Sequence, residues 1–593
     1  MLSTGTHARR PERLVRVTLF CLLAFAVASG ATAEELPGAY FRLMEAGIAQ
    51  VEERLAADPS ADLQSLEAKG ERWHHFSHVV LAAAVLYTRS HPSNPRYGDP
   101  KLLSLAIKVG DLLAQESEKG QIEAEDHHRD LYMWLEAYRL LERKLDKERR
   151  TRWRLELEKI GADLAGLIAP RVDFPWYQSP FIGTSPNHFS LWASTLYLAG
   201  RVFGRREWEE LGAKVMHRFA AVEQPNDGYW GEHNSSGPTT GYDYLTFTGV
   251  ALYHEHAQDP AALQALRRGT DFHKHFTYLD GNPVEVINDR NRYWEVSPWG
   301  HFGFSHFPDG RRYAEFLTSI FREGQLDMES LGRIAQNALY YHGGPTAPIP
   351  QDQLNYHYQM GVPAGIRKTG PWVVCLSGLI STQAVNNQFY LDRQGSLSIF
   401  HSKLGLSITG ANSKRQPELA TFSEKLGGQV FHMPISSRLQ MSAERDRLSL
   451  AYNTFFSDLY VSPRSDNEVT FRFVINGKGK PAEEAQLNLQ LCLKSGETLE
   501  TATGRKILLG PERIDLQPDA LGGWIRHHGW TLKIDPKAQL VWPVYPHNPY
   551  ANAPETTLEH AVGILSVPLR LKAQEGRYVR PGEQEISFTL RVD

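Results

Sequence analysis

The sequence predicts an α+β multidomain protein, in which a ring of helical hairpins is followed by an antiparallel β-sandwich. Three observations predict this fold. Over residues 35–345, apolar residues recur at steps of three and four, as they do along amphipathic helices. From about residue 365 the period changes to two, which is typical of strands. A Pro- and Gly-rich stretch separates the two patterns.

The N-terminus is predicted to be a signal peptide over residues 1–33. A basic segment precedes an apolar run of signal-peptide length, and "ATA" before Glu34 is a small-x-small cleavage site. No other stretch approaches about 18 consecutive apolar residues, so no membrane span is expected after cleavage. We therefore expect a secreted or periplasmic protein, although an uncleaved anchor or a lipoprotein remains an alternative.

The helical domain is predicted over residues 34–345. Several of its helices are apolar over much of their circumference, as expected when a helix has neighbours on both sides. So many helices in hairpins favour a ring over a four-helix bundle. The periodic segments are 74–90, 99–117, 130–145, 187–204, 206–222, 242–257, 260–276 and 327–342.

We expect a linker over residues 346–366 and the β-sandwich domain over residues 367–593. Two cysteines remain after signal cleavage, Cys375 and Cys492. They could pair in an exported protein, and the sequence leaves this open. The alternating segments of the β-sandwich domain are 396–411, 447–456, 468–477, 485–496 and 584–593.

Charge and histidine spacing narrow the functional classes. The formal charge of -4 is close to neutral, which argues against a nucleic-acid-binding protein. There is no zinc-like Cys/His spacing. His74 and His78 have an i,i+4 spacing, but no third ligand is evident nearby. We therefore predict no metal and no cofactor, and the oligomeric state stays open.

A set of polar residues predicts chemistry on an acidic sugar. β-Elimination removes the C5 proton of a uronic acid residue and expels the oxygen at C4. Amide and guanidinium donors must hold the carboxylate during this step, and Asn187, Arg290 and Arg292 are candidates. His233 and Tyr242 are candidates for the base and the acid, with the base unassigned between them.

These residues resemble polysaccharide lyase family 8, the hyaluronate and chondroitin lyases. The spacing D-G-x4-H-x8-Y occurs here as Asp227-Gly228, His233 and Tyr242, with Asn187 before it and the arginine pair after it. The helix start "PNHFSLWASTLYLAGR" also looks like that of alginate- and heparin-type toroidal lyases. The resemblance implies an (α/α) toroid with a β-sandwich, an acidic polysaccharide substrate, and a carboxylate-neutralising role for Asn187. It also implies that His233 and Tyr242 transfer protons, and that the arginines position the sugar or tune the tyrosine.

Nearby polar and aromatic side chains are expected to contact the sugar. The predicted substrate-binding residues are His188, Trp176, Tyr177, Trp230 and Asn234.

Two other functions stay open. A glycoside hydrolase on a similar ring would need two carboxylates roughly 5 to 10 Å apart. Asp227, Glu232, Asp243 and Glu285 are near enough in sequence to supply them. A non-catalytic carbohydrate-binding protein would need only an aromatic cleft.

Overall fold

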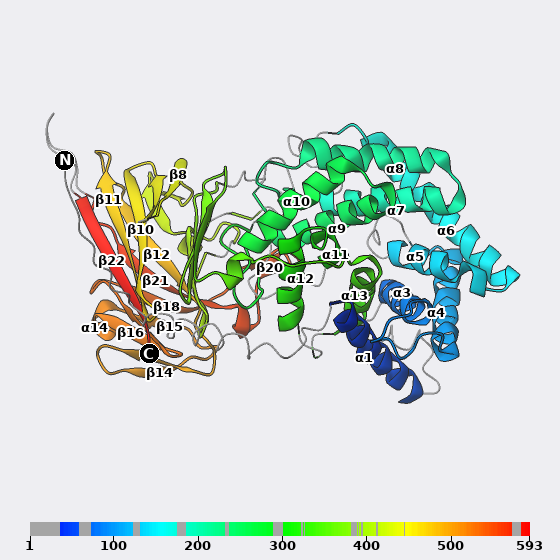
Figure 1. Cartoon of the computed structure of the whole chain (residues 1–593). Coiled ribbons are helices and arrows are strands. Elements are labelled where there is room, and N and C mark those ends of the chain that lie inside the picture. Colours follow the sequence, from blue (N-terminus) through cyan, green and yellow to red (C-terminus); the bar gives the residue numbers. More distant parts are fainter. Residues whose placement is uncertain are drawn as a thin grey trace, which may run out of the picture.

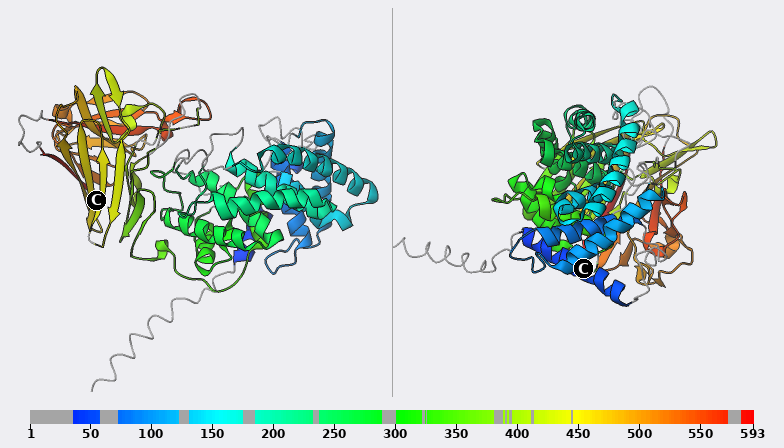
Figure 2. Two further views of the ribbon diagram at one scale, coloured as in Figure 1. Left: turned by 90° about the horizontal axis from the view of Figure 1, so that it is seen from above. Right: turned by 90° about the vertical axis from the view of Figure 1, so that its right-hand side faces the viewer.

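The structure is a computed structural model. It describes residues 36–57, 73–122, 131–174, 185–231, 237–288, 300–321, 324, 326–380, 388–389, 391–392, 395–410, 413–443, 445–571 and 583–593. A helical domain and a sheet domain lie side by side (Figure 1 and, from above, Figure 2). The predicted signal peptide lies outside the described residues. Within them, no helix has both the length and the apolar character that crossing a membrane requires.

The helical domain is built from hairpins whose alternate members form a circuit. α3 packs on α5, α5 on α7, α7 on α9, α9 on α11, α11 on α13, and α13 on α3 again. This closed circuit is the arrangement expected of a ring of helical hairpins. The helices are α1 (Leu36–Ala57), α3 (Trp73–Thr88), α4 (Pro100–Glu118), α5 (Leu131–Leu141), α6 (Lys147–Ile168), α7 (Pro186–Phe203), α8 (Arg206–Arg218), α9 (Thr240–Ala257), α10 (Pro260–His275), α11 (His301–Phe304), α12 (Pro308–Ile320) and α13 (Met328–Tyr340).

Local sequence fixes where several helices begin. Asp99 and Asp259 each precede a proline at the first helical position, and their carboxylates accept hydrogen bonds from the backbone N–H of Lys101 and Ala261. Aspartate caps satisfy N–H groups that have no partner within the helix. Asp146 caps α6 in the same way through the N–H of Arg149. These caps define the hairpin boundaries.

α7 and α9 run in the same direction. Gly249 of α9 lies against Ser190 of α7, where an added Cβ would be 2.9 Å from the serine hydroxyl oxygen. Further along both helices, the rings of Tyr253 and Tyr197 have centroids 5.0 Å apart. The N-terminal ends of α7 and α9 therefore lie at the same end of the ring.

Two antiparallel sheets form the sheet domain. The larger has the order β1-β2-β3-β4-β5-β12-β21-β18-β15, with β6 and β7 attached to β12. Its strands are β1 (Asn355–Gln359), β2 (Ala364–Thr369), β3 (Trp372–Ser377), β4 (Leu397–His401), β5 (Gly405–Thr409), β6 (Phe422–Leu426), β7 (Gln429–Phe431), β12 (Glu484–Leu491), β15 (Ile514–Leu516), β18 (Gln539–Val544) and β21 (Val562–Pro568).

The smaller sheet shares one hydrophobic core with the larger. Its order is β14-β13-β16-β17-β22-β11-β10-β9-β8. Ile399 and Leu489 of the larger sheet belong to the same buried cluster as Phe471 and Phe588 of the smaller one. The two sheets therefore enclose a common core. The strands are β8 (Ser436–Met441), β9 (Asp446–Ala451), β10 (Phe455–Ser465), β11 (Glu468–Gly477), β13 (Thr498–Thr501), β14 (Lys506–Leu508), β16 (Trp524–His527), β17 (Trp530–Lys533) and β22 (Glu583–Val592).

The predicted linker contains sheet structure. β1 and the first residues of β2 lie inside 346–366 and pair with each other, so the first strand of the larger sheet begins at Asn355. β1 is a short edge strand in which half-buried Tyr356 and Tyr358 alternate with exposed residues. Such a strand is hard to recognise between Pro- and Gly-rich flanks. The stretch between α13 and β1 is attached to the start of α12, because the N–H of Ala347 donates a hydrogen bond to the carbonyl oxygen of Pro308.

A third buried cluster, here called the interdomain cluster, joins the two domains. It lies between the end of α10 with the segment after it and the outer face of β1 to β5 (Figure 1). The cluster contains Tyr229, Phe272, Phe276, Tyr278, Val284, Val286, Ile287, Met360, Ala364, Ile366, Val373, Cys375, Phe400 and Leu406.

No disulfide joins Cys375 to Cys492, so the pairing left open by the sequence does not form here.

Candidate active site

Tyr242 lies in the first turn of α9 and is half-buried. Its hydroxyl is hydrogen-bonded to the hydroxyl of Tyr550, a residue of the sheet domain. Tyr550 occupies the turn between β19 (His547–Asn548) and β20 (Ala553–Pro554). The side chain of Asn548 holds this turn by accepting a hydrogen bond from the backbone N–H of Tyr550 at 2.9 Å. The sheet domain thus reaches the start of α9.

Asn187 is completely buried in the first turn of α7. The helix cap is Ser185, so Asn187 is not the cap, and the Ser185 hydroxyl donates to Asn187 Oδ1. Asn187 Nδ2 has no hydrogen-bond partner among the described residues. A buried donor left unsatisfied costs about 1–3 kcal/mol. Because α7 and α9 are parallel, this amide lies at the same end of the ring as Tyr242. His188 follows it and is half-buried.

Trp230, which precedes α9 in the chain, and Asn288, which follows α10, are both hydrogen-bonded to the first turn of α9. The backbone N–H of Trp230 donates to Asp243 Oδ1 at 2.7 Å. The side-chain amide of Asn288 donates to Thr240 Oγ1 at 2.8 Å. Because Asp243 and Thr240 flank Tyr242 in this turn, Trp230 and Asn288 both lie near Tyr242.

The prediction that Trp230 stacks on a sugar is wrong. The side chain is buried, and its indole N–H donates to the carbonyl oxygen of Phe219 at 3.0 Å. Trp230 therefore packs in the helical core, where its ring offers no face to a ligand. The sequence signal was ambiguous because a core tryptophan and a binding tryptophan share the same residue type.

The other predicted site residues lie outside the described residues, and their positions stay predictions. They are Trp176, Tyr177, His233, Asn234, Arg290 and Arg292.

Asp227 links the domains rather than facing a substrate. Its two carboxylate oxygens accept hydrogen bonds from the backbone N–H groups of Gly361 at 2.7 Å and Val362 at 3.2 Å, in the turn between β1 and β2. Gly228 after it has a φ of 90°, and an added Cβ would lie 2.2 Å from the carbonyl oxygen of Arg268. The Asp-Gly pair of the motif thus builds a tight interdomain turn.

Asp243 and Glu285 are buried and already hydrogen-bonded. Burial raises the pKa of Asp243, and the contact with His273 Nε2 at 2.9 Å opposes this shift. Burial likewise raises the pKa of Glu285, whose oxygens accept from Tyr278 at 2.9 Å and from the N–H of Gly410 at 3.1 Å. Both carboxyl groups are therefore occupied by hydrogen bonds to other groups of the protein. Glu232, the fourth candidate acid, lies outside the described residues.

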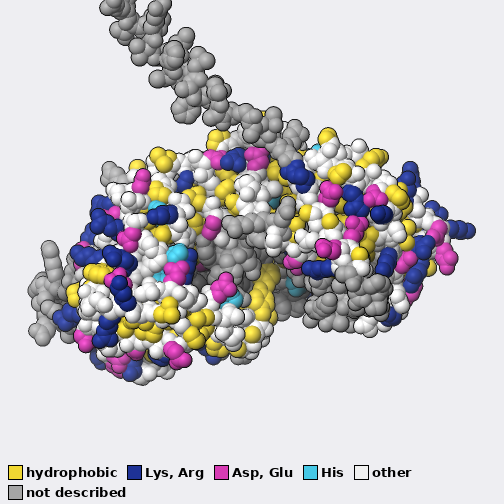
Figure 3. All heavy atoms as spheres, turned by 90° about the horizontal axis from the view of Figure 1, so that it is seen from below, with side chains coloured by type: hydrophobic (Ala, Val, Ile, Leu, Met, Phe, Trp, Pro, Cys, Tyr) yellow, Lys and Arg dark blue, Asp and Glu magenta, His cyan; other side chains and the backbone are white. Residues whose placement is uncertain are grey.

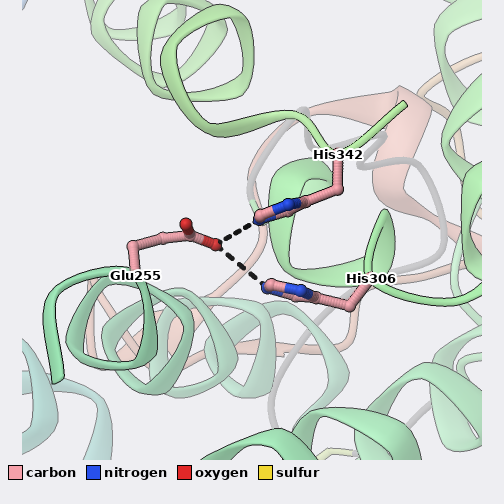
Figure 4. A group of neighbouring side chains, drawn as sticks. All are labelled: Glu255, His306 and His342. Atoms are coloured by element: carbon pink, nitrogen blue, oxygen red, sulfur yellow. Dashed lines mark hydrogen bonds and ion pairs between the residues drawn. The ribbon is translucent and has the colours of Figure 1, made fainter. Parts of the chain in front are cut away.

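One group in the described part of the chain has the spacing of metal ligands. Glu255, His306 and His342 place their ligand atoms within 4.8 Å of one another (Figure 4). Glu255 is in the last turn of α9, at the opposite end of this helix from Tyr242. The earlier pair of His74 and His78 is untested, because the side chain of His74 lies outside the described residues.

Charged side chains of both signs are interspersed on the face shown in Figure 3. This agrees with the nearly neutral formal charge of the chain.

No family model matches this chain, and no curated protein matches it. Among solved structures, it is similar to a heparan sulfate lyase from Pedobacter heparinus, with 10% identity, 87% of this chain and 75% of that chain covered, and a TM-score of 0.46. It is also similar to a variant of a chondroitin AC lyase from Streptomyces coelicolor A3, with 12% identity, 93% and 79% covered, and a TM-score of 0.47. A third structure is a GH127 β-L-arabinofuranosidase from Geobacillus stearothermophilus T6, with 12% identity, 93% and 95% covered, and a TM-score of 0.26. Likeness of this degree does not by itself assign an activity.

Proposed function

We propose that this chain is a secreted polysaccharide lyase that cleaves a uronic-acid-containing polysaccharide by β-elimination. In this proposal the closed circuit of helices is an (α/α) toroid, and the two sheets are the β-sandwich packed beside it. The observation that carries the proposal is the buried amide of Asn187. Its Nδ2 lacks a partner within the described part of the chain, at the end of the ring where Tyr242 also lies.

The Asn187 amide suits a uronate carboxylate. A buried N–H group without a partner is an unusual cost to stability, and a bound carboxylate oxygen would satisfy it. During elimination, negative charge develops on this carboxylate as the C5 proton leaves. A donor that is already fixed in place stabilises this charge without reorganisation during the reaction.

Proton transfer completes the reaction. The base removes the C5 proton, the electron pair forms the C4–C5 double bond, and the C4–O bond breaks. The departing oxygen takes a proton from the acid, so no water is consumed. Tyr242 is the proposed acid, and either His233 or Tyr242 itself serves as the base.

The remaining proposed residues follow the two anchored residues, Trp230 and Asn288, in sequence. His233 follows Trp230 by three residues, and Arg290 and Arg292 follow Asn288 by two and four. Trp230 and Asn288 are both hydrogen-bonded to the first turn of α9, where Tyr242 lies. We infer that the imidazole and a guanidinium join the site from these two sides, where the guanidinium would hold the sugar carboxylate.

Tyr550 is the proposed positioning residue. Its hydroxyl is hydrogen-bonded to that of Tyr242, and its side chain is 54% exposed. The hydrogen bond fixes the direction of the Tyr242 phenol, and the Tyr550 hydroxyl is the group that passes a proton on toward solvent in this proposal.

The described carboxylates favour elimination over hydrolysis. A hydrolase needs two acidic side chains that face one bound sugar. Asp227, Asp243 and Glu285 are instead occupied by protein donors. An elimination mechanism needs none of them at the reacting carbons.

A panel of acidic polysaccharides tests the proposal. We expect at least one uronate polymer to give an unsaturated product that absorbs in the near ultraviolet, and neutral glycans to give none. The Tyr242→Phe variant should lose this signal, while Tyr253→Phe on the same helix should keep it. Cleavage of a neutral glycan without an unsaturated product would instead favour a hydrolase.

Export is tested separately. We expect the mature protein, recovered outside the cytoplasm, to begin at Glu34. A full-length N-terminus would contradict the proposed cleavage.

A further inference from the structure

We propose that Glu255, His306 and His342 hold a divalent transition-metal ion, with Zn²⁺ the best match. The three side chains come from separate segments and point toward one another (Figure 4). Glu255 is in the last turn of α9, His306 lies between α11 and α12, and His342 follows α13 by two residues. Two imidazoles and a carboxylate, with a fourth position open to water, form a ligand set that zinc accepts.

The distances are close to those of a filled site. Nε2 of His306 and Nε2 of His342 each lie 2.9 Å from the same oxygen, Oε1 of Glu255. Ligand atoms about 2.0–2.2 Å from a tetrahedral zinc ion lie about 3.3–3.6 Å from one another. A shift of the carboxylate by well under an ångström therefore makes room for the ion among the three atoms.

The site is enclosed on one side and open on the other. The side chains of Glu255 and His306 are 7% and 10% exposed, whereas that of His342 is 41% exposed. An ion thus has an entry path past His342, and the two other ligands are held in place by their surroundings.

The arrangement of the donor atoms also suits an ion. The rings of His306 and His342 have centroids 4.0 Å apart, so both imidazoles can reach one ion beside Glu255. Without a metal, both Nε2 atoms must carry a proton to donate to one carboxylate oxygen. A metal ion binds neutral imidazoles through unprotonated nitrogen and gives the carboxylate a positive partner.

Hydrogen bonds fix the backbone beside both histidines. The N–H of His342 donates to the hydroxyl oxygen of Ser305 at 2.9 Å. Arg311 donates to the carbonyl oxygen of Ser305 at 2.7 Å and to that of Pro345 at 2.9 Å. The ring of His254 packs edge-on against His306, with centroids 5.0 Å apart. Ligands held this way need little reorganisation when an ion binds.

The ion would have a structural role. It would join α9, the α11–α12 link and the start of the connection to the sheet domain. Glu255 lies thirteen residues beyond Tyr242 on α9, or about 20 Å at 1.5 Å per residue. This inference is therefore independent of the proposed elimination chemistry.

Metal binding to the full-length mature protein tests the inference. After chelator treatment and dialysis, we expect calorimetric titration with Zn²⁺ to show one saturable site per chain and the thermal midpoint to rise. Loss of an outer partner of a metal ligand commonly weakens binding 10- to 100-fold, so loss of a ligand should cost at least about tenfold. His342→Ala should show this loss, and Co²⁺ should give the visible absorption of a four-coordinate site only in the wild type.

Controls separate this site from surface histidines and from misfolding. His217→Ala removes an exposed histidine that pairs with Asp259 at 2.8 Å just beyond α9, and it should leave Zn²⁺ affinity unchanged. His306→Gln provides a second ligand variant, and both variants should keep the metal-free thermal midpoint near that of the wild type.

Equal Zn²⁺ affinity in the wild type and in a folded His342→Ala or His306→Gln protein would overturn the inference, as would no saturable binding to the wild type. A chelator-treated wild type that keeps its polysaccharide cleavage would support the structural role. Loss of cleavage by a metal-free protein that is still folded, with recovery on addition of Zn²⁺, would overturn it.

Discussion

The two ends of α9 differ in how their polar groups are satisfied. At the end facing the sheet domain, half-buried Tyr242 meets a residue of the other domain, and the nearby amide of Asn187 keeps an unsatisfied donor. At the far end, His256 Nε2 lies 2.9 Å from the hydroxyl of Tyr132, and Tyr340 donates to the carboxylate of Glu136 at 2.6 Å. Tyr132 and Glu136 are buried, His256 and Tyr340 are half-buried, and each has a partner within the helical domain.

The difference separates groups that serve a ligand from groups that serve the fold. Buried polar groups in native proteins are nearly always paired, so an exception calls for a reason. At the sheet-facing end, the reason we propose is a bound sugar. We therefore expect substitutions there to reduce activity more than stability, and substitutions of paired groups elsewhere to do the reverse.

The largest effect is expected for Tyr242→Phe. Removal of a proton-transfer group lowers kcat by about 100- to 10,000-fold. The matched variant Tyr253→Phe removes a hydroxyl from the far end of the same helix, where it donates to Asp259 at 3.2 Å. This variant should keep its activity, as measured by near-ultraviolet absorbance. Equal activities in the two variants would remove the functional distinction between the ends.

Asn187→Ala is expected to lower kcat by about 100- to 1,000-fold, because it removes a donor to the developing charge. Asn337→Ala is the matched control. Asn337 is also completely buried, and its Oδ1 accepts from the N–H of Phe302 at 3.2 Å. Its loss should cost about 1–3 kcal/mol of stability and leave activity unchanged. Steady-state kinetics and denaturant unfolding of both variants measure this contrast, and a loss of stability alone for Asn187→Ala would contradict it.

Tyr550→Phe should have a smaller effect, which sharpens the role of the sheet domain. One hydrogen bond is worth about 0.5–1.5 kcal/mol, or roughly a two- to tenfold change in kcat. Because the substitution changes the hydrogen bonding of the Tyr242 phenol, the alkaline side of the pH–rate profile should also shift. An unchanged kcat and profile would show that the contact between the tyrosines does not position Tyr242.

The last effect concerns stability at low pH, and no change in activity at neutral pH is expected from it. His275 ends α10 at the sheet-facing end and stacks on Tyr358, with ring centroids 4.1 Å apart. Burial, with a smaller effect of Lys274, lowers the pKa of His275 to about 4 from 6.5. The stability that neutral His275 provides is thus present above pH 6.5 and is lost as the pH falls toward 4. At pH 5 the loss is about 2 kcal/mol.

His275→Phe removes this titration and keeps an aromatic ring on Tyr358. We expect the free energy of unfolding of the variant to fall less than that of the wild type between pH 7 and pH 5. His357→Phe, at an exposed position of β1, is the control and should retain the wild-type pH dependence. A variant that loses stability as steeply as the wild type would place the acid sensitivity elsewhere.

Much of the fold follows from the periodicity of the sequence. The alternating segment 468–477 coincides with β11, and the segment 187–204 with α7, because long regular patterns determine which face is buried. The sequence predicts a linker where β1 lies, because five residues between turn signals carry little periodicity. The packing of so short a strand depends on its neighbours in the sheet and in the helical domain.

The site was less predictable than the fold. Residue type and spacing selected Asn187 and Tyr242, but their placement at one end of the ring depends on the parallel packing of α7 and α9. Tyr550 gave no signal, because it lies in a Pro- and Asn-rich turn far along the chain. Glu255 and the two histidines near it in space are equally scattered in sequence, so only the fold brings them together.

The interdomain cluster has a practical consequence for dissecting this protein. Cutting the chain between α13 and β1 would separate the two faces of this cluster. Phe276, Val286 and their neighbours on one fragment, and Ile366 and Phe400 on the other, would then be exposed to solvent. Exposed apolar faces of this kind promote aggregation. Neither half is therefore expected to remain monomeric when produced alone, and limited proteolysis should release no stable fragment that ends between the last helix and the first strand.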